Sequence, residues 1–324
     1  MKKSAKNCIE KLNVELKAYP NTNKEQESKL TNDIINNISI LTGFINTTNY
    51  KKLKEVEKVN ELIYKDLTVS LMIKLMPVCN QVILNSISGL LQTTILKFPD
   101  NSLPSHFMRQ TNDLNSLFLM FDNIAVGSTA HIIFRACLIR NRSFAEFILK
   151  NNYAIWFFQY LVDDNFDKIG PAFASFDIIL NTYVDLSVEH ISSNWTLYLL
   201  QFKILLHSNS YIILSYFLNI LYKFLNCREC KNLMMKFIDD PENLVIIMNL
   251  LKSPKRRLSV GSYNIFKLFA MNARRSKYTL SVLKENKDTL LQLLTNYTVP
   301  DVPTNQEVID DEHEQLLNEI MNIK

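Results

Sequence analysis

Residues 240–251, DPENLVIIMNLL, decide the fold class. Asp240 is a preferred N-cap residue, and Pro241 takes the first helical position, where the missing N–H costs nothing. Apolar side chains then recur with the i, i+3, i+4, i+7 spacing of an amphipathic helix, namely Leu244, Ile247, Met248 and Leu251. The segment therefore predicts a well-capped helix whose apolar face packs against neighbouring elements.

The same pattern recurs through the second half of the chain. Polar breaks at 163–165, 207–210 and 252–254, counted at residues 163, 207 and 253, lie 44 and 46 residues apart. Each break precedes an apolar helical segment, over 166–180, 211–225 and 258–271. A period near 45 fits the ~40–47 residues of armadillo and HEAT repeats. We therefore expect an all-α, armadillo/HEAT-like, right-handed helical-repeat solenoid.

Three parts are expected along the chain. Residues 1–30 form an N-terminal helix and loop, 31–300 the helical-repeat solenoid, and 301–324 an acidic linker and C-terminal helix. Residues 99–104 are expected to be a long loop, and the acidic run 310–312 to open the last helix, where its charge suits the positive dipole end.

Composition excludes several function classes. Only 5 of 324 residues are glycine, whereas nucleotide-binding turns and phosphate-cradling loops need glycine at defined positions. A Rossmann enzyme, a P-loop NTPase, a protein kinase and a turn-rich β-sandwich are therefore disfavoured. The net charge of +4 comes from 36 basic and 32 acidic residues, interspersed along the chain. That balance argues against nucleic acid as the main partner.

The chain carries no signal of export or of a membrane span. Its start is basic but lacks the apolar segment of a secretory signal. The most apolar stretch, 211–224, is too short for the ~20 residues of a transmembrane helix. Five scattered cysteines fit a reducing compartment. We therefore expect a cytoplasmic protein.

Two short motifs were weighed for chemistry. Cys227 and Cys230 form a C-x-x-C, but no second pair supplies the four ligands of a structural zinc, so two thiols at helix ends are favoured. Residues 255–259, KRRLS, resemble a basophilic phosphorylation site, and a solvated helix start is the favoured interpretation. The five histidines stand apart in sequence. We expect no enzyme activity, metal, cofactor or small-molecule substrate.

Several blocks in fixed order resemble the Mo-25-like scaffold family, also called calcium-binding protein 39. The resemblance covers about residues 130–324. Its blocks are LLHS at 205–208, DPENL at 240–244, MNLL at 248–251 and FKLF at 266–269, together with 166–176 and the acidic 310–312. The resemblance implies a non-catalytic armadillo-like scaffold. Despite the family's name, the sequence offers no calcium loop.

The resemblance also implies partners and sites. Family members bind Ste20-type protein kinases and a related pseudokinase, hold the kinase domain in its active conformation, and act in cell polarity. On the concave kinase-binding face, the family's contacts match Phe166, Tyr211 and Arg228. A separate C-terminal pocket captures a Trp-Glu-Phe tripeptide from the partner's tail, and its methionine matches Met248.

This chain departs from the family at four positions. Ser215 and Asn219 replace basic residues on the helix after Tyr211, Lys231 replaces an aromatic, and Glu285 stands where a pocket lysine is expected. These changes leave an alternative open, a generic helical-repeat adaptor that has lost kinase activation. An enzyme that uses the C-x-x-C thiols is a third reading, from another class.

Overall fold

The computed structural model describes residues 2–47, 52–65, 67–163, 165–297 and 306–323. These residues form α-helices joined by short turns and 3₁₀ segments, with no β-strand. The chain divides into two compact units, 1–183 and 184–324. Among the described helices, none is both long and apolar enough to cross a membrane.

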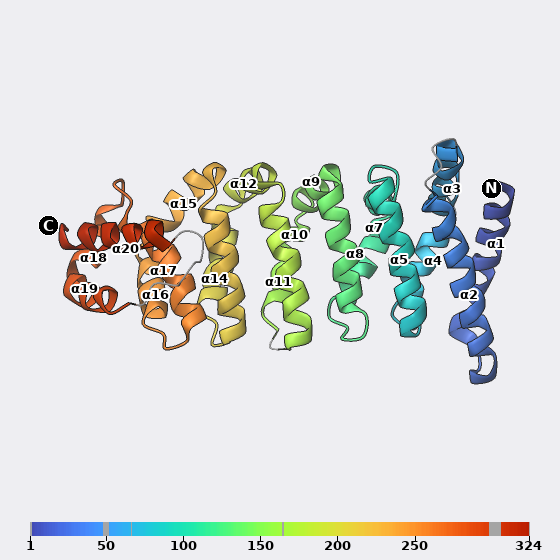
Figure 1. Ribbon diagram of the computed structural model, residues 1–324, viewed down its shortest axis with the longest axis horizontal. Coiled ribbons are helices and arrows are strands. Elements are labelled where there is room, and N and C mark those ends of the chain that lie inside the picture. Colours follow the sequence, from blue (N-terminus) through green and yellow to red (C-terminus); the bar gives the residue numbers. More distant parts are fainter. Residues whose placement is uncertain (1, 48–51, 66, 164, 298–305, 324) are drawn as a thin grey trace. The chain divides into compact units, whose positions relative to one another are not determined.

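The N-terminal unit is a series of stacked helices (Figure 1). Its elements are α1 (Lys2–Ala18), η1 (Tyr19–Asn21), α2 (Lys24–Ile45), α3 (Leu53–Lys65), α4 (Thr68–Leu75), α5 (Gln81–Lys97), α6 (Leu103–Arg109), α7 (Thr111–Met120), α8 (Gly127–Arg140), α9 (Arg142–Lys150), α10 (Tyr153–Trp156), η3 (Phe157–Leu161) and α11 (Phe166–Asn181). The longer helices α2, α5, α8 and α11 pack each against the next.

The C-terminal unit continues the pattern. Its elements are α12 (Val184–Ser193), α13 (Trp195–Leu206), α14 (Tyr211–Leu225), η4 (Arg228–Cys230), α15 (Lys231–Ile238), α16 (Pro241–Leu251), α17 (Arg256–Ala270), α18 (Lys277–Glu285), α19 (Lys287–Thr295) and α20 (Gln306–Met321). Within this unit α14 packs on α17, and α17 on α16.

The predicted repeat is confirmed. Helices α11, α14 and α17 begin at Phe166, Tyr211 and Arg256, so successive starts are 45 residues apart. Asp240 caps α16 by accepting a hydrogen bond from the Glu242 amide. The face predicted to be apolar, from Leu244 to Leu251, is buried. The chain is thus an all-α helical-repeat protein, as expected.

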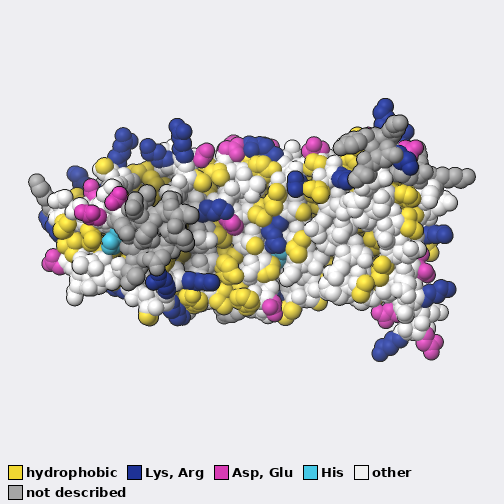
Figure 2. Space-filling view, in the orientation of Figure 1, with side chains coloured by type: hydrophobic (Ala, Val, Ile, Leu, Met, Phe, Trp, Pro, Cys, Tyr) yellow, Lys and Arg dark blue, Asp and Glu magenta, His cyan; other side chains and the backbone are white. Residues whose placement is uncertain are grey.

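Aromatic side chains fill the cores of both units. Around α7 and α8, the rings of Phe118, Phe121, Phe134 and Phe157 pack with centroids 4.9–6.3 Å apart. Ring pairs at these separations add stability beyond the area that they bury. Basic and acidic side chains both lie on the visible surface of each unit (Figure 2).

Two expectations about connections were wrong. The loop expected at 99–104 is shorter, because α6 begins at Leu103 with a proline in its first turn. Asn60 and Asn141 also donate hydrogen bonds to the loop's carbonyl oxygens. The acidic run 310–312 does not open the last helix, since α20 begins at Gln306. Residues 301–305, expected to end the solenoid, lie outside the described residues, and the three-part division stays a prediction.

Candidate partner-binding surface and peptide pocket

Tyr211 begins α14 and lies beside a basic segment. Its side chain is half-buried, and Lys255 Nζ lies 4.8 Å from its ring centroid. Lys255 is the N-cap residue of α17, so this cation–π contact joins the starts of two packed helices. Such a contact contributes roughly 0.5–1 kcal/mol at an exposed site. It fixes the ring at the edge of the unit, where it can still meet a partner.

The exposed side of α14 is neutral over the two turns that follow Tyr211, before the exposed Lys223 in its last turn. Ser215 and Asn219 follow at one-turn intervals, and they are half-buried and exposed respectively. The Ser215 hydroxyl is shielded from solvent and has no hydrogen-bond partner among the described residues. Tyr216 remains 37% exposed. This part of α14 offers a partner the Tyr216 ring and the Asn219 amide, and positive charge enters only with Lys223, one turn further.

Arg228 is presented by a short anchored turn. Cys230 ends η4 and is fully buried, and Cys227 precedes the turn and donates a hydrogen bond to the Lys223 carbonyl. Arg228 is exposed, and while its backbone carbonyl accepts a hydrogen bond from the Lys231 amide, its guanidinium pairs with no described residue. The C-x-x-C therefore acts as the anchor of a turn that holds Arg228 towards solvent.

The thiols lack the character of a reactive pair. Burial first, and then the neighbouring Cys227 and Glu229, together raise the pKa of Cys230 to about 12. A nucleophilic or metal-binding cysteine instead needs a lowered pKa. Within the described part of the chain, no group of three His, Cys, Asp or Glu side chains could hold a metal ion.

Phe166 lies in the N-terminal unit. It is the first residue of α11 and is 62% exposed, while the preceding Asn165 caps the helix through the Asp167 amide. A large aromatic side chain left in solvent at a helix start is free to contact a partner. A binding face that Phe166 shares with Tyr211 and Arg228 stays a prediction, because those two residues belong to the other unit.

Met248 belongs to the packed interior of α16. It is only 5% exposed and does not line the pocket next to it. Leu251, one turn further along the same face, does line it. Substituting Met248 therefore disturbs packing as well as any binding site, so other residues test the pocket better.

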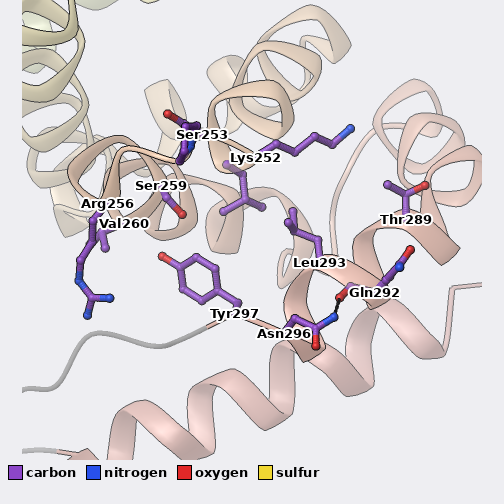
Figure 3. Close-up of a pocket in the computed structure, with 12 residues that line it drawn as sticks. Lys252, Ser253, Arg256, Ser259, Val260, Thr289, Gln292, Leu293, Asn296 and Tyr297 are labelled. Atoms are coloured by element: carbon purple, nitrogen blue, oxygen red, sulfur yellow. Dashed lines mark hydrogen bonds between the residues drawn. The ribbon is translucent and has the colours of Figure 1, made fainter.

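A cavity of about 520 Å³ opens between the end of α16, the start of α17 and α19, and we call it the α16–α19 pocket (Figure 3). Its apolar lining is Leu251, Pro254, Val260 and Leu293, and its polar lining is Ser253, Ser259, Thr289, Gln292, Asn296 and Tyr297. Lys252 and Arg256 supply positive charge, and no acidic side chain among the described residues lines the pocket. Apolar walls with a few convergent polar groups are typical of ligand sites.

Tyr297 connects this pocket to the core. Its ring stacks on Tyr263 with centroids 4.7 Å apart, and burial raises the pKa of Tyr297 while the Ser259 hydroxyl and Arg256 charge act to lower it. His313 Nε2 lies 3.2 Å from the Leu294 carbonyl oxygen, which can only accept. The Tyr263 hydroxyl therefore donates to His313 Nδ1, at 2.8 Å. This chain of contacts fixes the wall of the pocket against α20.

Comparison with known proteins gives the family. The sequence model of the Mo25-like family matches residues 1–324. The chain belongs to the Mo25-like family. Among relatives, the degreening-related gene dee76 protein of Auxenochlorella protothecoides is 29% identical over 184 residues, 57% of each chain. The calcium-binding protein 39-like protein of Homo sapiens is 28% identical over 60% of this chain and 56% of its own. The chain thus spans about 57% of the length of the first curated relative it matches.

Two further proteins, one natural and one designed, are similar to this chain. The Mo25-like protein of Schizosaccharomyces pombe is 29% identical over 60% of this chain and 58% of its own. A designed armadillo repeat protein in complex with the peptide (KR)4 aligns with a TM-score of 0.45 and 11% identity, over 82% of this chain and 98% of its own.

In this Mo25-like chain the charge of the pocket comes from residues that the sequence analysis did not assign to it. Glu285 ends α18, is exposed, and accepts a hydrogen bond from Ser281, outside the pocket lining. Lys252 and Arg256 instead line the cavity. The basic run 255–257 signals Arg256, although a solvated helix start is its favoured interpretation from sequence, and Lys252 lies outside that run. Lys231 lines a separate cavity of about 700 Å³ with Met234, Met235 and Met271.

The histidines of this Mo25-like chain are less isolated than expected. His106 Nε2 lies 2.7 Å from Asp113 Oδ2, and Ser70 donates to that same oxygen at 2.5 Å. His131 Nδ1 lies 2.9 Å from the Ser175 hydroxyl. The Asp113 carboxylate lies between Ser70 and His106, so the histidine does not contact the serine hydroxyl. His131 and Ser175 do contact each other, but both side chains are fully buried. Neither arrangement resembles a nucleophile activated beside a substrate.

Proposed function

We propose that this chain is a non-catalytic cytoplasmic scaffold that binds a Ste20-type protein kinase or pseudokinase. The surface around Arg228 and Tyr211, with Phe166 of the N-terminal unit, would hold the kinase domain. The α16–α19 pocket would capture a short peptide from the partner. The observation that carries the proposal is this pocket, whose apolar walls and two basic side chains suit a peptide with bulky apolar residues around a carboxylate.

Arginine and tyrosine are the expected anchors of such a contact. A guanidinium offers a planar fork to a carboxylate or a carbonyl oxygen, and a tyrosine ring supplies contact area with little loss of side-chain entropy. Both residue types are enriched among interface hot spots. Arg228 is already exposed and has no ion pair with a described residue, so binding would not break an existing pair.

Activation would follow from preferential binding. Shifting a kinase from 1:99 to 99:1 in favour of its active conformation takes about 5.5 kcal/mol of differential affinity. A few buried anchors reach that magnitude. A peptide held in the pocket would also raise the effective concentration of the kinase domain near the other surface. In a cell, the complex would act in signalling that controls polarity.

The first test is affinity capture from the native cytosol with the wild-type chain, Arg228→Ala and the control Arg140→Ala. Arg140 is also an exposed arginine, at the end of α8. A Ste20-type kinase bound by the wild type and by the control, but depleted with Arg228→Ala, supports the assignment. Equal capture by all three chains removes Arg228 from the site. Absence of any kinase refutes the kinase assignment.

The pocket is tested with a fluorescent peptide that ends in Trp-Glu-Phe. Lys252→Glu and Arg256→Glu should each weaken binding several-fold, because an exposed ion pair worth ~0.2–1 kcal/mol is lost and replaced by repulsion of the peptide carboxylate. Lys231→Glu, which changes charge at the other cavity, is the matched control. A peptide with glutamine in place of glutamate should lose the difference between wild type and variants. Unchanged affinity in both pocket variants would exclude the pocket.

A generic protein adaptor without kinase activation is the second candidate. The neutral Ser215 and Asn219 on the exposed face of α14 favour it, since the resemblance implies basic residues there. The separating measurement is the activity of a captured kinase with and without the chain. Binding without a change in its rate supports the adaptor, and a raised rate supports the activating scaffold.

A further inference from the structure

The basic run at the start of α17 lies next to a serine in the pocket. Residues 255–259 read KRRLS, so two arginines precede Ser259 by three and two positions. Serine/threonine kinases that select arginine read such residues through carboxylates that pair with the guanidinium groups. Ser259 is half-buried and lines the α16–α19 pocket together with Arg256. The Ser259 hydroxyl therefore belongs both to the basic sequence motif and to the lining of the pocket.

The first turn of α17 is poorly stabilised. Its N-cap residue, Lys255, makes no side-chain capping bond, and the turn contains no acidic residue. Arg256 and Arg257 instead place positive charge at the positive end of the helix dipole, which is unfavourable. Lys255 is also held over the Tyr211 ring, one residue outside the helix. The missing cap and the unfavourable charges lower the cost of opening this turn into the extended form that a kinase binds, although the amides of Leu258 and Ser259 must then leave the Lys255 carbonyl.

A phosphate on Ser259 would be stabilised where it forms. Negative charge in the first turn suits the helix dipole, and Arg256 and Lys252 line the same cavity. The added group would take up part of the pocket, and its charge of about −1.5 to −2 would cancel most or all of the positive charge of Lys252 and Arg256. In Figure 3, the side chains of Ser259 and Tyr297 face one another across the pocket, so the phosphate would stand beside the Tyr297 ring.

We propose that Ser259 is a phosphorylation site for an arginine-directed serine/threonine kinase, and that its phosphate closes the α16–α19 pocket to acidic peptides. The Ser259 Oγ forms a bond to the γ-phosphorus of Mg·ATP, the bond from that phosphorus to the β,γ-bridging oxygen breaks, and ADP leaves. The hydroxyl proton passes to the catalytic base of the modifying kinase. The closing of the pocket rests on the proposed function, whereas the modification site does not.

The site is tested on the full-length chain with the catalytic subunit of an arginine-directed kinase and Mg·ATP. Intact mass and peptide mapping should show one phosphate on Ser259, absent from Ser259→Ala and retained in Ser276→Ala. Ser276 also follows two arginines, but its hydroxyl caps α18. Arg256→Ala should slow the reaction about tenfold or more, as expected when a charged contact to the kinase is lost. A chain left unmodified while the free peptide 252–264 is phosphorylated overturns the site.

The effect on the pocket is tested by comparing the modified and unmodified chains with the Trp-Glu-Phe peptide. Phosphorylation should weaken binding roughly tenfold or more, because the phosphate neutralises the basic side chains of the pocket and fills part of its volume. Saturating peptide should in turn slow the phosphorylation, because the coupling of two ligands is reciprocal. Equal affinity of both forms overturns the closing of the pocket. No binding by the unmodified chain refutes the peptide pocket itself, while the mass result still decides the modification site.

Discussion

His131 should make the N-terminal unit sensitive to mild acid. The side chain is 1% exposed, its ring stacks on Phe121 with centroids 3.9 Å apart, and Nδ1 lies 2.9 Å from the Ser175 hydroxyl. Nε2 has no hydrogen-bond partner among the described residues. Burial, reinforced by the Arg135 charge, lowers the pKa of His131 to about 3. The imidazole is therefore neutral in the native chain.

The size and sign of the effect follow from proton linkage. In the unfolded chain His131 takes up a proton near its ordinary pKa of about 6.5, whereas in the native chain its imidazole stays neutral down to about pH 3. Stability from this group is fully present above pH ~6.5 and is lost as the pH falls, by about 1.4 kcal/mol per pH unit. Between pH 7 and pH 5 the loss should be about 2 kcal/mol.

Urea unfolding followed by circular dichroism measures this loss. His131→Phe keeps an aromatic ring beside Phe121 but cannot take a proton, so the wild type should lose about 2 kcal/mol more than this variant between pH 7 and pH 5. The comparison cancels carboxylates, which titrate in both proteins. His207→Gln, at an exposed histidine, should keep the wild-type dependence. Identical pH dependence of the wild type and His131→Phe would refute the reasoning.

Three further predictions concern stability and reactivity. Gly127→Ala should destabilise the chain by ~1–3 kcal/mol in thermal or urea unfolding, because the added Cβ would lie 2.9 Å from a backbone oxygen. Gly89→Ala, where an added Cβ meets no atom within 4 Å, should instead stabilise the chain by ~0.5–1 kcal/mol. Equal shifts in the two variants would contradict this. Asp240→Ala should cost ~1 kcal/mol through the lost cap, with an unchanged midpoint as the contrary result. Alkylation at pH 8 should label Cys227 well before Cys230, whose pKa is about 12 and which is buried; faster labelling of Cys230 would revive a redox role.

The repeat was readable from sequence because it depends on local signals. Polar breaks, capping residues and apolar spacing all act within one or two helical turns. They place the starts of α11, α14 and α17 correctly or within two residues. The same signals give the burial of the Cys8, Ile9, Leu12 and Leu16 stripe in α1. A helix that buries one face has apolar residues at helical spacing, so its own sequence predicts which side chains are buried.

The connections were less predictable because their partners are distant in sequence. Asn60 and Asn141 bond to the same short loop from 41 and 42 residues away, on either side of it. His106, Asp113 and Ser70 likewise come from three different helices. No local pattern marks an asparagine or a histidine as the partner of a particular remote carbonyl or carboxylate. The histidines therefore stand apart in sequence although His106 contacts a carboxylate in the folded chain.

The sequence also does not predict which residues line the α16–α19 pocket or supply its charge. Met248 and Leu251 lie on one apolar face of α16, and sequence spacing alone cannot say which of them borders a cavity. The basic side chains of the pocket stand at Lys252 and Arg256, while position 285 is acidic. An electrostatic contact depends on distance in space, so a cation on one helix can replace a cation on another. Position-by-position comparison registers only the acidic residue at 285, whereas the α16–α19 pocket of this chain is basic through Lys252 and Arg256.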